Sequence, residues 1–348
     1  MKKIGYVVFV EDKYYLLWQL ELFLHSLTQR AGIDPSQIVV LWADPSQHNP
    51  DIPWASSPYL NSIFSEYPTT RFHCVQNWGR RNWYFRFEGD GSWAPRQYAG
   101  INKWLSLCES ANAHWLDDFD EILLLEQDLW FSGAFPILPP GNCVTDNWLC
   151  DRHEALAVKD KSPEENTDGF DLDDIMYICK VPAKNMQLWT KGAIVFKFKL
   201  KDLKRTDLLN AFVNYNQLLM TLGELCLPGG SRHETDMIAP SLAMAHCGIV
   251  SHTVNDKRWN SEVWIGDQDI PEGSVIHYGW DFNNYSHLNA SFNKFIHSES
   301  GPWTNKSLKK EYKKLKFDWL RDFYDDIFLL GKKKIDRTCN REVAAPVV

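Results

Sequence analysis

The sequence lacks several features that would assign the chain to a large class of proteins. Its 348 residues contain no uninterrupted apolar run of about 18 residues, so we expect no transmembrane segment. Its eight cysteines are scattered without a C-x-x-C pair, which favours buried thiols over a zinc site or a disulfide framework. Basic residues are not in excess, because the net charge is −8 with 24% charged residues. A nucleic-acid partner is therefore not expected, and a soluble globular protein is.

Motifs of several enzyme classes are also absent. There is no G-x-S-x-G, no G-x-x-x-x-G-K-[ST], and "HETDM" at residues 233–237 breaks the H-E-x-x-H pattern. Hydrolase, P-loop and zinc-protease interpretations are therefore excluded. The apolar run in "MKKIGYVVFVEDK" is too short for the core of a signal peptide, so we expect a cytoplasmic protein.

Aromatic residues, by contrast, are abundant. They make up 14% of the chain, and 16 of them are tryptophan. Many will pack in the core, but aromatic rings also stack on sugar and peptide surfaces. The composition is therefore compatible with a carbohydrate site without demonstrating one.

Apolar runs typical of strands alternate with segments of helical spacing. The expected strands cover residues 3–10, 37–44, 71–78, 121–128 and 191–200. The expected helices cover residues 14–30, 94–111, 207–223 and 234–248. This alternation predicts an α/β fold with a mainly parallel central sheet and flanking helices.

Two further segments have a distinct composition. Residues 151–174 are acidic and poor in apolar side chains, so they are expected to form a surface loop, a lid or a disordered insertion. Residues 307–336 form a charged amphipathic helix, expected to pack on the body with a solvated lysine face; a membrane-surface helix is the alternative. We therefore divide the chain into a domain over residues 1–300 and a helical tail over residues 301–348.

The segment "EILLLEQDLW" contains the strongest chemical signal. Four apolar residues run directly into Glu126 and Asp128, and the apolar residues 129–131 follow at once. Such a run is typical of a buried strand in a parallel sheet, and ligands of open α/β sheets bind where these strands end. Acids there can cap a following turn or helix. Two carboxylates can instead hold Mg²⁺ or Mn²⁺, which share their coordination with substrate phosphates.

A histidine late in the chain is a candidate third ligand. His277 follows a short β-type run in "SVIHYGWDF". A lone histidine is more often a hydrogen-bonded structural residue, but an imidazole beside two carboxylates suits Mn²⁺. We therefore predict a metal site of Glu126, Asp128 and His277, with His252, His287 or water as alternatives to His277.

Several motifs together resemble those of GT-A glycosyltransferases, in particular the plant hydroxyproline O-arabinosyltransferases and the peptidyl-serine α-galactosyltransferases. "DKYYLLWQ" is similar to the opening Asp-x-x-Tyr-x-x-Trp-Gln motif of that family, and "INKWL" is similar to its Asn-Arg-Pro-Trp segment. "LLLEQDLWF" resembles its Glu-Pro-Asp-His-Ile-Phe motif, with Gln127 in place of the proline. "ETDMIAPSLAMAHCG" and "VIHYGWDF" resemble its Glu-Met-Tyr helix and its Ile-His-Tyr segment, in the same order.

The resemblance implies a GT-A-like fold and transfer of a sugar of the arabinose or galactose type. The donor would be a UDP-sugar, and the acceptor a hydroxyl group, as in hydroxyproline or serine of a peptide, or a glycan. The relatives retain the configuration of the transferred sugar and use a metal ion, here Mn²⁺ or Mg²⁺.

The resemblance also assigns roles to individual residues. Glu126, Asp128 and His277 would bind the metal, and Asp236 with Glu234 would be the acids that face the transferred sugar. The residues implied in donor binding are Asp12, Tyr15, Lys103, Glu126, Gln127 and Lys294. Each has an ordinary structural alternative, such as helix capping by Asp12, packing by Tyr15 and solvent exposure of Lys103 and Lys294.

Two other functions remain open on the sequence alone. A sugar nucleotidyltransferase also uses a metal and acids on an α/β sheet, but it would normally carry a glycine-rich phosphate loop that "FVEDKYYLLW" lacks. A catalytically inactive carbohydrate- or peptide-binding module would keep aromatic surfaces but would not need the acids and the histidine.

Overall fold

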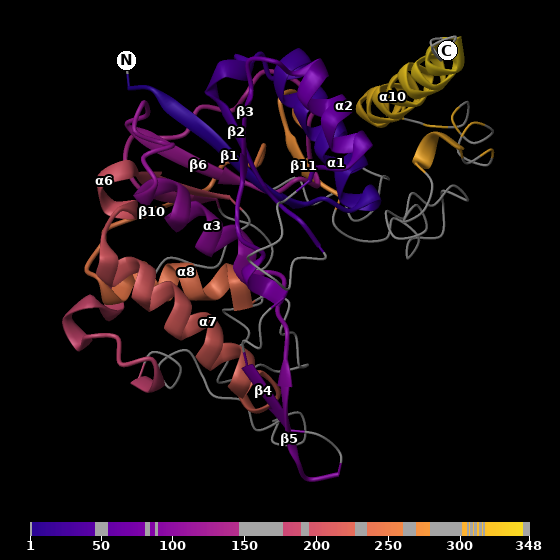
Figure 1. The fold of residues 1–348 in the computed structure, drawn as a ribbon. Helices are drawn as coiled ribbons and strands as arrows, with labels where there is room; N and C mark the ends of the chain where they lie inside the picture. Colours follow the sequence, from indigo (N-terminus) through magenta and orange to yellow (C-terminus); the bar gives the residue numbers. More distant parts are fainter. Residues whose placement is uncertain are drawn as a thin grey trace.

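The computed structural model is drawn in Figure 1. It describes residues 2–45, 55–80, 84–87, 90–145, 177–188, 195–226, 235–259, 269–278, 301–304, 306, 309, 312, 315 and 317–343. The acidic segment predicted over residues 151–174 lies outside these ranges.

A seven-stranded sheet forms the centre of the fold. In spatial order its strands are β10 (His252–Val254), β8 (Cys143–Thr145), β9 (Phe196–Lys199), β6 (Glu121–Leu125), β1 (Ile4–Glu11), β2 (Ile38–Ala43) and β3 (Arg71–Cys74). Strands β6, β1, β2 and β3 are mutually parallel, as are β10 and β8, whereas β9 runs antiparallel to both of its neighbours. The predicted α/β fold with a mainly parallel sheet is confirmed.

Two short antiparallel pairs lie outside this sheet. They are β7 (Leu129–Phe131) with β11 (Val275–His277), and β4 (Tyr84–Phe87) with β5 (Trp93–Arg96). The first pair continues directly from the loop after β6, whereas the second projects away from the body of the molecule (Figure 1).

Helices cover both faces of the sheet. The α-helices are α1 (Tyr14–His25), α2 (Pro58–Glu66), α3 (Ile101–Asn112), α6 (Leu200–Leu203), α7 (Thr206–Cys226), α8 (Thr235–His246) and α10 (Asp318–Val343). A π-helical turn, Ser26–Arg30, continues α1, and short 3₁₀ turns occupy Pro35–Gln37, Trp78–Arg80, Ala183–Leu188 and Pro302–Thr304. None of the helices in the described ranges is both long and apolar enough to cross a membrane.

The alternation of side chains along β1 explains the layers. Val7 packs with α3, α7 and α8 on one face, whereas Val8 and Val10 pack with α1 and α2 on the other. Every residue of β2 and β6 is buried, as expected for strands covered on both faces. The uninterrupted apolar runs in the sequence therefore correspond to the inner strands of the sheet.

The helix predicted over residues 94–111 is wrong in its first part. Residues 93–96 belong to β5, and α3 begins only at Ile101. Pro95 disfavours a helical conformation for the residue before it, and Pro95 lies opposite Phe85 in the hairpin. Pairing with β4 supplies the backbone hydrogen bonds that a helix would otherwise have provided.

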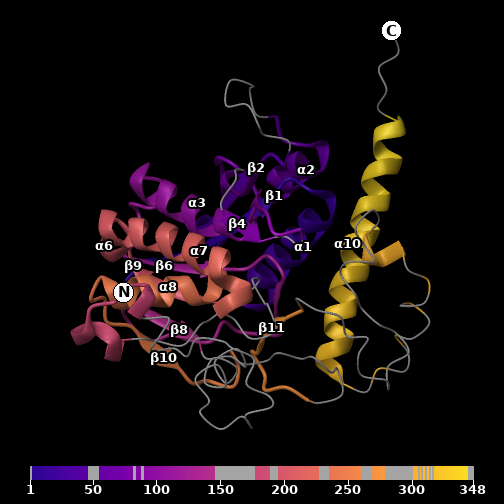
Figure 2. The ribbon, with the colours of Figure 1, turned by 90° about the horizontal axis from the view of Figure 1, so that it is seen from below.

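The C-terminal helix packs on the body beside α1, as predicted (Figure 2). Its inward face is buried against the aromatic side chains of Trp18 and Trp130. Its lysines are not all solvated, since Lys333 pairs with Glu66 at 2.7 Å and Lys334 pairs with Glu21 at 2.9 Å. Helix α10 begins at Asp318, and of the earlier part of the predicted helix the structure describes only residues 309, 312, 315 and 317.

Candidate metal centre

Glu126 and Asp128 follow the central strand of the sheet. Strand β6 ends at Leu125, which lies opposite Val8 of the parallel strand β1. The loops after β6 and β1 therefore emerge at the same edge of the sheet. This is the position expected for a ligand site in an open α/β fold.

A strand from much later in the sequence reaches the same edge. In the β7–β11 pair, His277 lies opposite Leu129 and Ile276 lies opposite Trp130. The backbone N–H of Tyr278 donates to the carbonyl oxygen of Asp128 at 3.1 Å. Backbone pairing thus places the histidine beside the two acids.

The three side chains point toward one another. Nε2 of His277 lies 3.4 Å from Oδ2 of Asp128 and 3.6 Å from Oε2 of Glu126. One ligand atom from each residue lies within 4.8 Å of the other two. The side chains of Asp128, His277 and Glu126 are 5%, 11% and 14% exposed, so the cluster is largely shielded yet reachable from solvent.

The donor set suits a hard or borderline divalent cation. Carboxylate oxygens bind Mg²⁺ and Mn²⁺, and the imidazole nitrogen favours Mn²⁺. The separations of 3.4 and 3.6 Å are close to the roughly 3 Å between neighbouring ligands of an octahedral ion. The residues present therefore fit the predicted metal.

A cavity of about 250 Å³ adjoins the cluster. The predicted donor-binding residues Tyr15, Lys103, Glu126 and Gln127 all line it. The Nζ atom of Lys103 lies 2.5 Å from Oε1 of Glu126, with both side chains largely buried. The structure thus brings four of the six predicted donor-binding residues into one cavity that includes a predicted metal ligand.

Tyr15 is partly buried and lies near two acids. Burial raises the pKa of its hydroxyl group, and the nearby charges of Glu11 and Asp128 raise it further. Tyr15 therefore remains a neutral hydrogen-bond donor at the cavity over the physiological pH range.

Asp12 has a different environment. Its carboxylate accepts hydrogen bonds from the backbone N–H and the hydroxyl of Ser57, both at 2.6 Å. Ser57 in turn caps α2 by accepting from the N–H of Leu60 at 3.1 Å. Asp12 thus stabilises the start of α2, and it is not among the residues that line the cavity.

Glu11, which was not among the predicted site residues, is a buried acid at this edge of the sheet. It is 4% exposed, forms an ion pair with Lys13 and accepts a hydrogen bond from Asn77 Nδ2 at 3.0 Å. Glu11 lines the same cavity as Lys103. In the sequence Glu11 directly follows an apolar run, as Glu126 does, and this shared pattern could have identified Glu11 as a candidate site residue.

The remaining predicted residues are only partly described. Asp236 lies in the first turn of α8, and its side chain lies outside the description, as do Glu234, Lys294 and His287. His252 lies on β10, at the edge of the sheet, and is not part of the cluster. Trp18 is 1% exposed and stacks on Tyr278, in agreement with an architectural role.

The chain matches no protein-family model, and a comparison with curated proteins found no match. What the site does must therefore be inferred from its own side chains.

Proposed function

We propose that the protein is a metal-dependent glycosyltransferase of the GT-A type that uses a UDP-sugar donor. The observation that carries the proposal is the convergence of Glu126, Asp128 and His277 beside a cavity lined by Lys103 and Tyr15. A divalent cation at the three ligands would neutralise charge on the departing diphosphate.

Charge balance at the site supports binding of a diphosphate. The two carboxylates of the cluster bring two negative charges, Lys103 brings one positive charge, and a divalent ion would bring two more. The ion pair of Glu11 and Lys13, which also line the cavity, adds no net charge. With neutral His277 the loaded site would carry a net positive charge. An anionic ligand that contacts both the ion and Lys103 would be attracted to such a site.

The other lining residues have roles that follow from their chemistry. The ammonium group of Lys103, now paired with Glu126, can turn toward a phosphate oxygen. The Tyr15 hydroxyl can donate to the nucleoside, and Gln127 supplies an amide beside it.

The finer assignments come from the family resemblance. They are transfer of an arabinose- or galactose-type sugar, with retention, to hydroxyproline or serine of a peptide or to a glycan. In this scheme Asp236 and Glu234 are the acids near the transferred sugar, and Lys294 is a further contact to the diphosphate.

Calorimetry tests the proposal at the binding step. UDP should bind more tightly with Mn²⁺ than with EDTA, and Asp128→Asn should remove that difference. An exposed acid far from the cluster, Asp118, which pairs with Arg71, provides the matched control Asp118→Asn. Equal UDP affinity in Mn²⁺ and in EDTA would contradict the proposal.

A second assay separates the competing functions. UDP-sugars are incubated with the protein and Mn²⁺, and release of UDP is measured for each sugar. UDP release from a UDP-sugar supports a glycosyltransferase. In a parallel incubation with UTP and a sugar phosphate, release of pyrophosphate would instead indicate a nucleotidyltransferase. Binding without turnover of any UDP-sugar would indicate an inactive module.

A further inference from the structure

The strand pair that carries His277 and directly follows Asp128 lies between the main core and α10. Leu129, Phe131 and Val275 face the core that includes α1 and α2. Trp130 and Ile276, which lie opposite each other in the pair, face the cluster formed with α10. The position of β7 and β11 therefore depends on both neighbours.

The contacts with α10 occur next to the metal ligands. The ring of Phe323 lies 5.5 Å from that of Trp130 and 5.4 Å from that of Tyr278, measured between centroids. Trp130 follows Asp128 by two residues, and Tyr278 directly follows His277. All three aromatic side chains are almost completely buried. A shift of α10 would thus be transmitted to the backbone that presents the ligands.

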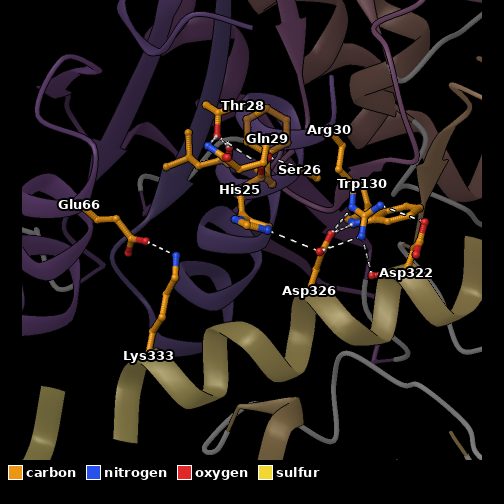
Figure 3. Close-up of polar contacts among 12 residues, drawn as sticks. His25, Ser26, Thr28, Gln29, Arg30, Glu66, Trp130, Asp322, Asp326 and Lys333 are labelled. Carbon is orange, nitrogen blue, oxygen red and sulfur yellow. Dashed lines mark hydrogen bonds and ion pairs between the residues drawn. The ribbon is translucent and has the colours of Figure 1, made fainter. Parts of the chain in front are cut away.

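The carboxylate of Asp326 on α10 bonds directly to the indole of Trp130 (Figure 3). The indole N–H of Trp130 donates to Oδ2 of Asp326 at 2.8 Å, and Nε of Arg30 donates to the same oxygen at 2.6 Å. Oδ1 accepts from Nη2 of Arg30 at 3.0 Å and lies 3.4 Å from Nε2 of His25. The guanidinium of Arg30 also lies 5.0 Å from the centre of the Trp130 ring.

Packing alone does not require an acid at this position. The side chain of Asp326 is 7% exposed, and burial of a charge is unfavourable unless it is fully paired, as it is here by Arg30 and His25. An apolar residue would leave Arg30 and the indole N–H without this acceptor, whereas the hydrogen bond from the indole adds a directional constraint on the rotation of the ring. The network therefore specifies where Trp130 lies.

We propose that Asp326 is a positioning residue of the metal centre that acts through Trp130. By holding the indole, Asp326 holds the middle of the β7–β11 pair, and the pair keeps Asp128 and His277 within reach of one ion. This inference rests on the proposed metal site and adds α10 to it as a structural support.

Two ion pairs near this seam provide matched controls. Asp322, one turn away on α10, pairs with Nη1 of Arg30 at 3.0 Å, and its side chain is 49% exposed. Lys333 pairs with Glu66 of α2 at 2.7 Å. Figure 3 shows that the Lys333–Glu66 pair joins α10 to the body away from Trp130, whereas Asp322 shares Arg30 with Asp326, which alone of the two accepts from the indole N–H. Removing either ion pair tests whether any loosening of α10 weakens Mn²⁺ binding.

Mn²⁺ binding can be followed from the electron paramagnetic resonance signal of the free ion. Asp326→Asn and Trp130→Phe are each expected to weaken Mn²⁺ binding about tenfold, the loss typical when a supporting residue of a metal site is removed. Asp322→Asn and Lys333→Met should bind Mn²⁺ as the wild type does. Leu208→Ala, at the start of α7, lowers stability in another part of the core and controls for general destabilisation.

The outcomes separate the two proposals. If the wild-type protein binds no Mn²⁺, the proposed function fails and this inference fails with it. If the wild type binds Mn²⁺ through His277 and Asp326→Asn binds it equally well, only the positioning role is overturned. The positioning role is also overturned if Leu208→Ala and Asp326→Asn lower the melting temperature equally and weaken Mn²⁺ binding equally.

Discussion

Nε2 of His277 lies 3.4 Å from Oδ2 of Asp128, although the two residues come from different halves of the chain. They meet because β11 pairs with β7, which begins at the residue after Asp128. The candidate metal centre is thus a product of backbone pairing, and the side chains need only ordinary orientations to converge.

Replacement of His277 by alanine should weaken Mn²⁺ binding at least tenfold and should reduce the effect of Mn²⁺ on UDP affinity. The reason is loss of the nitrogen ligand, since the two carboxylates remain. Titration calorimetry measures both effects. His252→Ala, on the edge strand β10, should behave as the wild type does. Unchanged Mn²⁺ dependence in His277→Ala, with loss of that dependence in Asp128→Ala, would show that His277 is not a ligand.

Replacement of Lys103 by methionine should change metal and nucleotide affinity in opposite directions. Glu126 would lose the ammonium group that lies 2.5 Å away, so Mn²⁺ alone should bind a few-fold more tightly. UDP in the presence of Mn²⁺ should bind about tenfold more weakly, because a charged hydrogen bond to phosphate is lost. Uridine, which has no phosphate, serves as the control ligand. A loss of uridine affinity equal to that of UDP would contradict a phosphate contact.

Asp326 should stabilise the protein in a pH-dependent manner. Burial alone would raise the pKa of its carboxyl group, but hydrogen bonds from His25, Arg30 and Trp130 outweigh burial and lower the pKa below the usual value. A lowered pKa in the folded state means that the contribution is present above the unfolded pKa and is lost as the pH falls through the folded one. The contribution is therefore full at neutral pH and declines below about pH 4.

Denaturant unfolding of the wild type and of Asp326→Asn measures this contribution. The difference in the free energy of unfolding should be about 2 kcal/mol at neutral pH, the size of a charged hydrogen bond, and should shrink in acid. Asp322→Asn, whose carboxylate is half exposed, should show a much smaller difference. A difference for Asp326→Asn that stays constant down to about pH 2 would refute the ion-pair explanation.

The buried pair of Lys197 and Glu121 should be sensitive to removal of one partner. Nζ of Lys197 lies 2.7 Å from Oε2 of Glu121, and the side chains are 1% and 3% exposed. Lys197→Met should lower the free energy of unfolding by roughly 3 kcal/mol or more, because a buried carboxylate loses its main partner. The double variant Lys197→Met/Glu121→Leu should recover much of that loss. If the effects of the two single substitutions simply add, the pair does not interact as described.

The central strands could be predicted from the sequence because their signal is local. Strand β2 is apolar throughout and β6 is apolar after its first residue, Glu121, and that pattern is enough to assign a covered strand. The pair β7–β11 could not be predicted in the same way, since each strand has three residues and their pairing depends on the rest of the fold. His277 was therefore selected for its residue type and its resemblance to a motif, without any local sign of where it would lie.

The acids of α10 illustrate a second limit. Asp318, Asp322 and Asp326 look equivalent in a charged amphipathic sequence, yet the side chain of Asp318 is 93% exposed and that of Asp326 is 7% exposed. Only the packing of the helix distinguishes them. The same holds for Glu11 and Asp12: Asp12, predicted as a site residue, stabilises α2, whereas its neighbour Glu11 lines the cavity.

The pairing of β11 with β7 also has a consequence for the order of folding. Strand β11 can reach β7 only by closing a loop that contains β8, β9, α7 and α8, and contacts so distant in sequence form slowly. Helices α7 and α8, which pack directly against each other, depend on much shorter loops. During refolding from denaturant the helical circular dichroism signal should therefore recover before the capacity to bind Mn²⁺ does. A nascent or partly refolded chain would then be helical, compact and still unable to hold the ion.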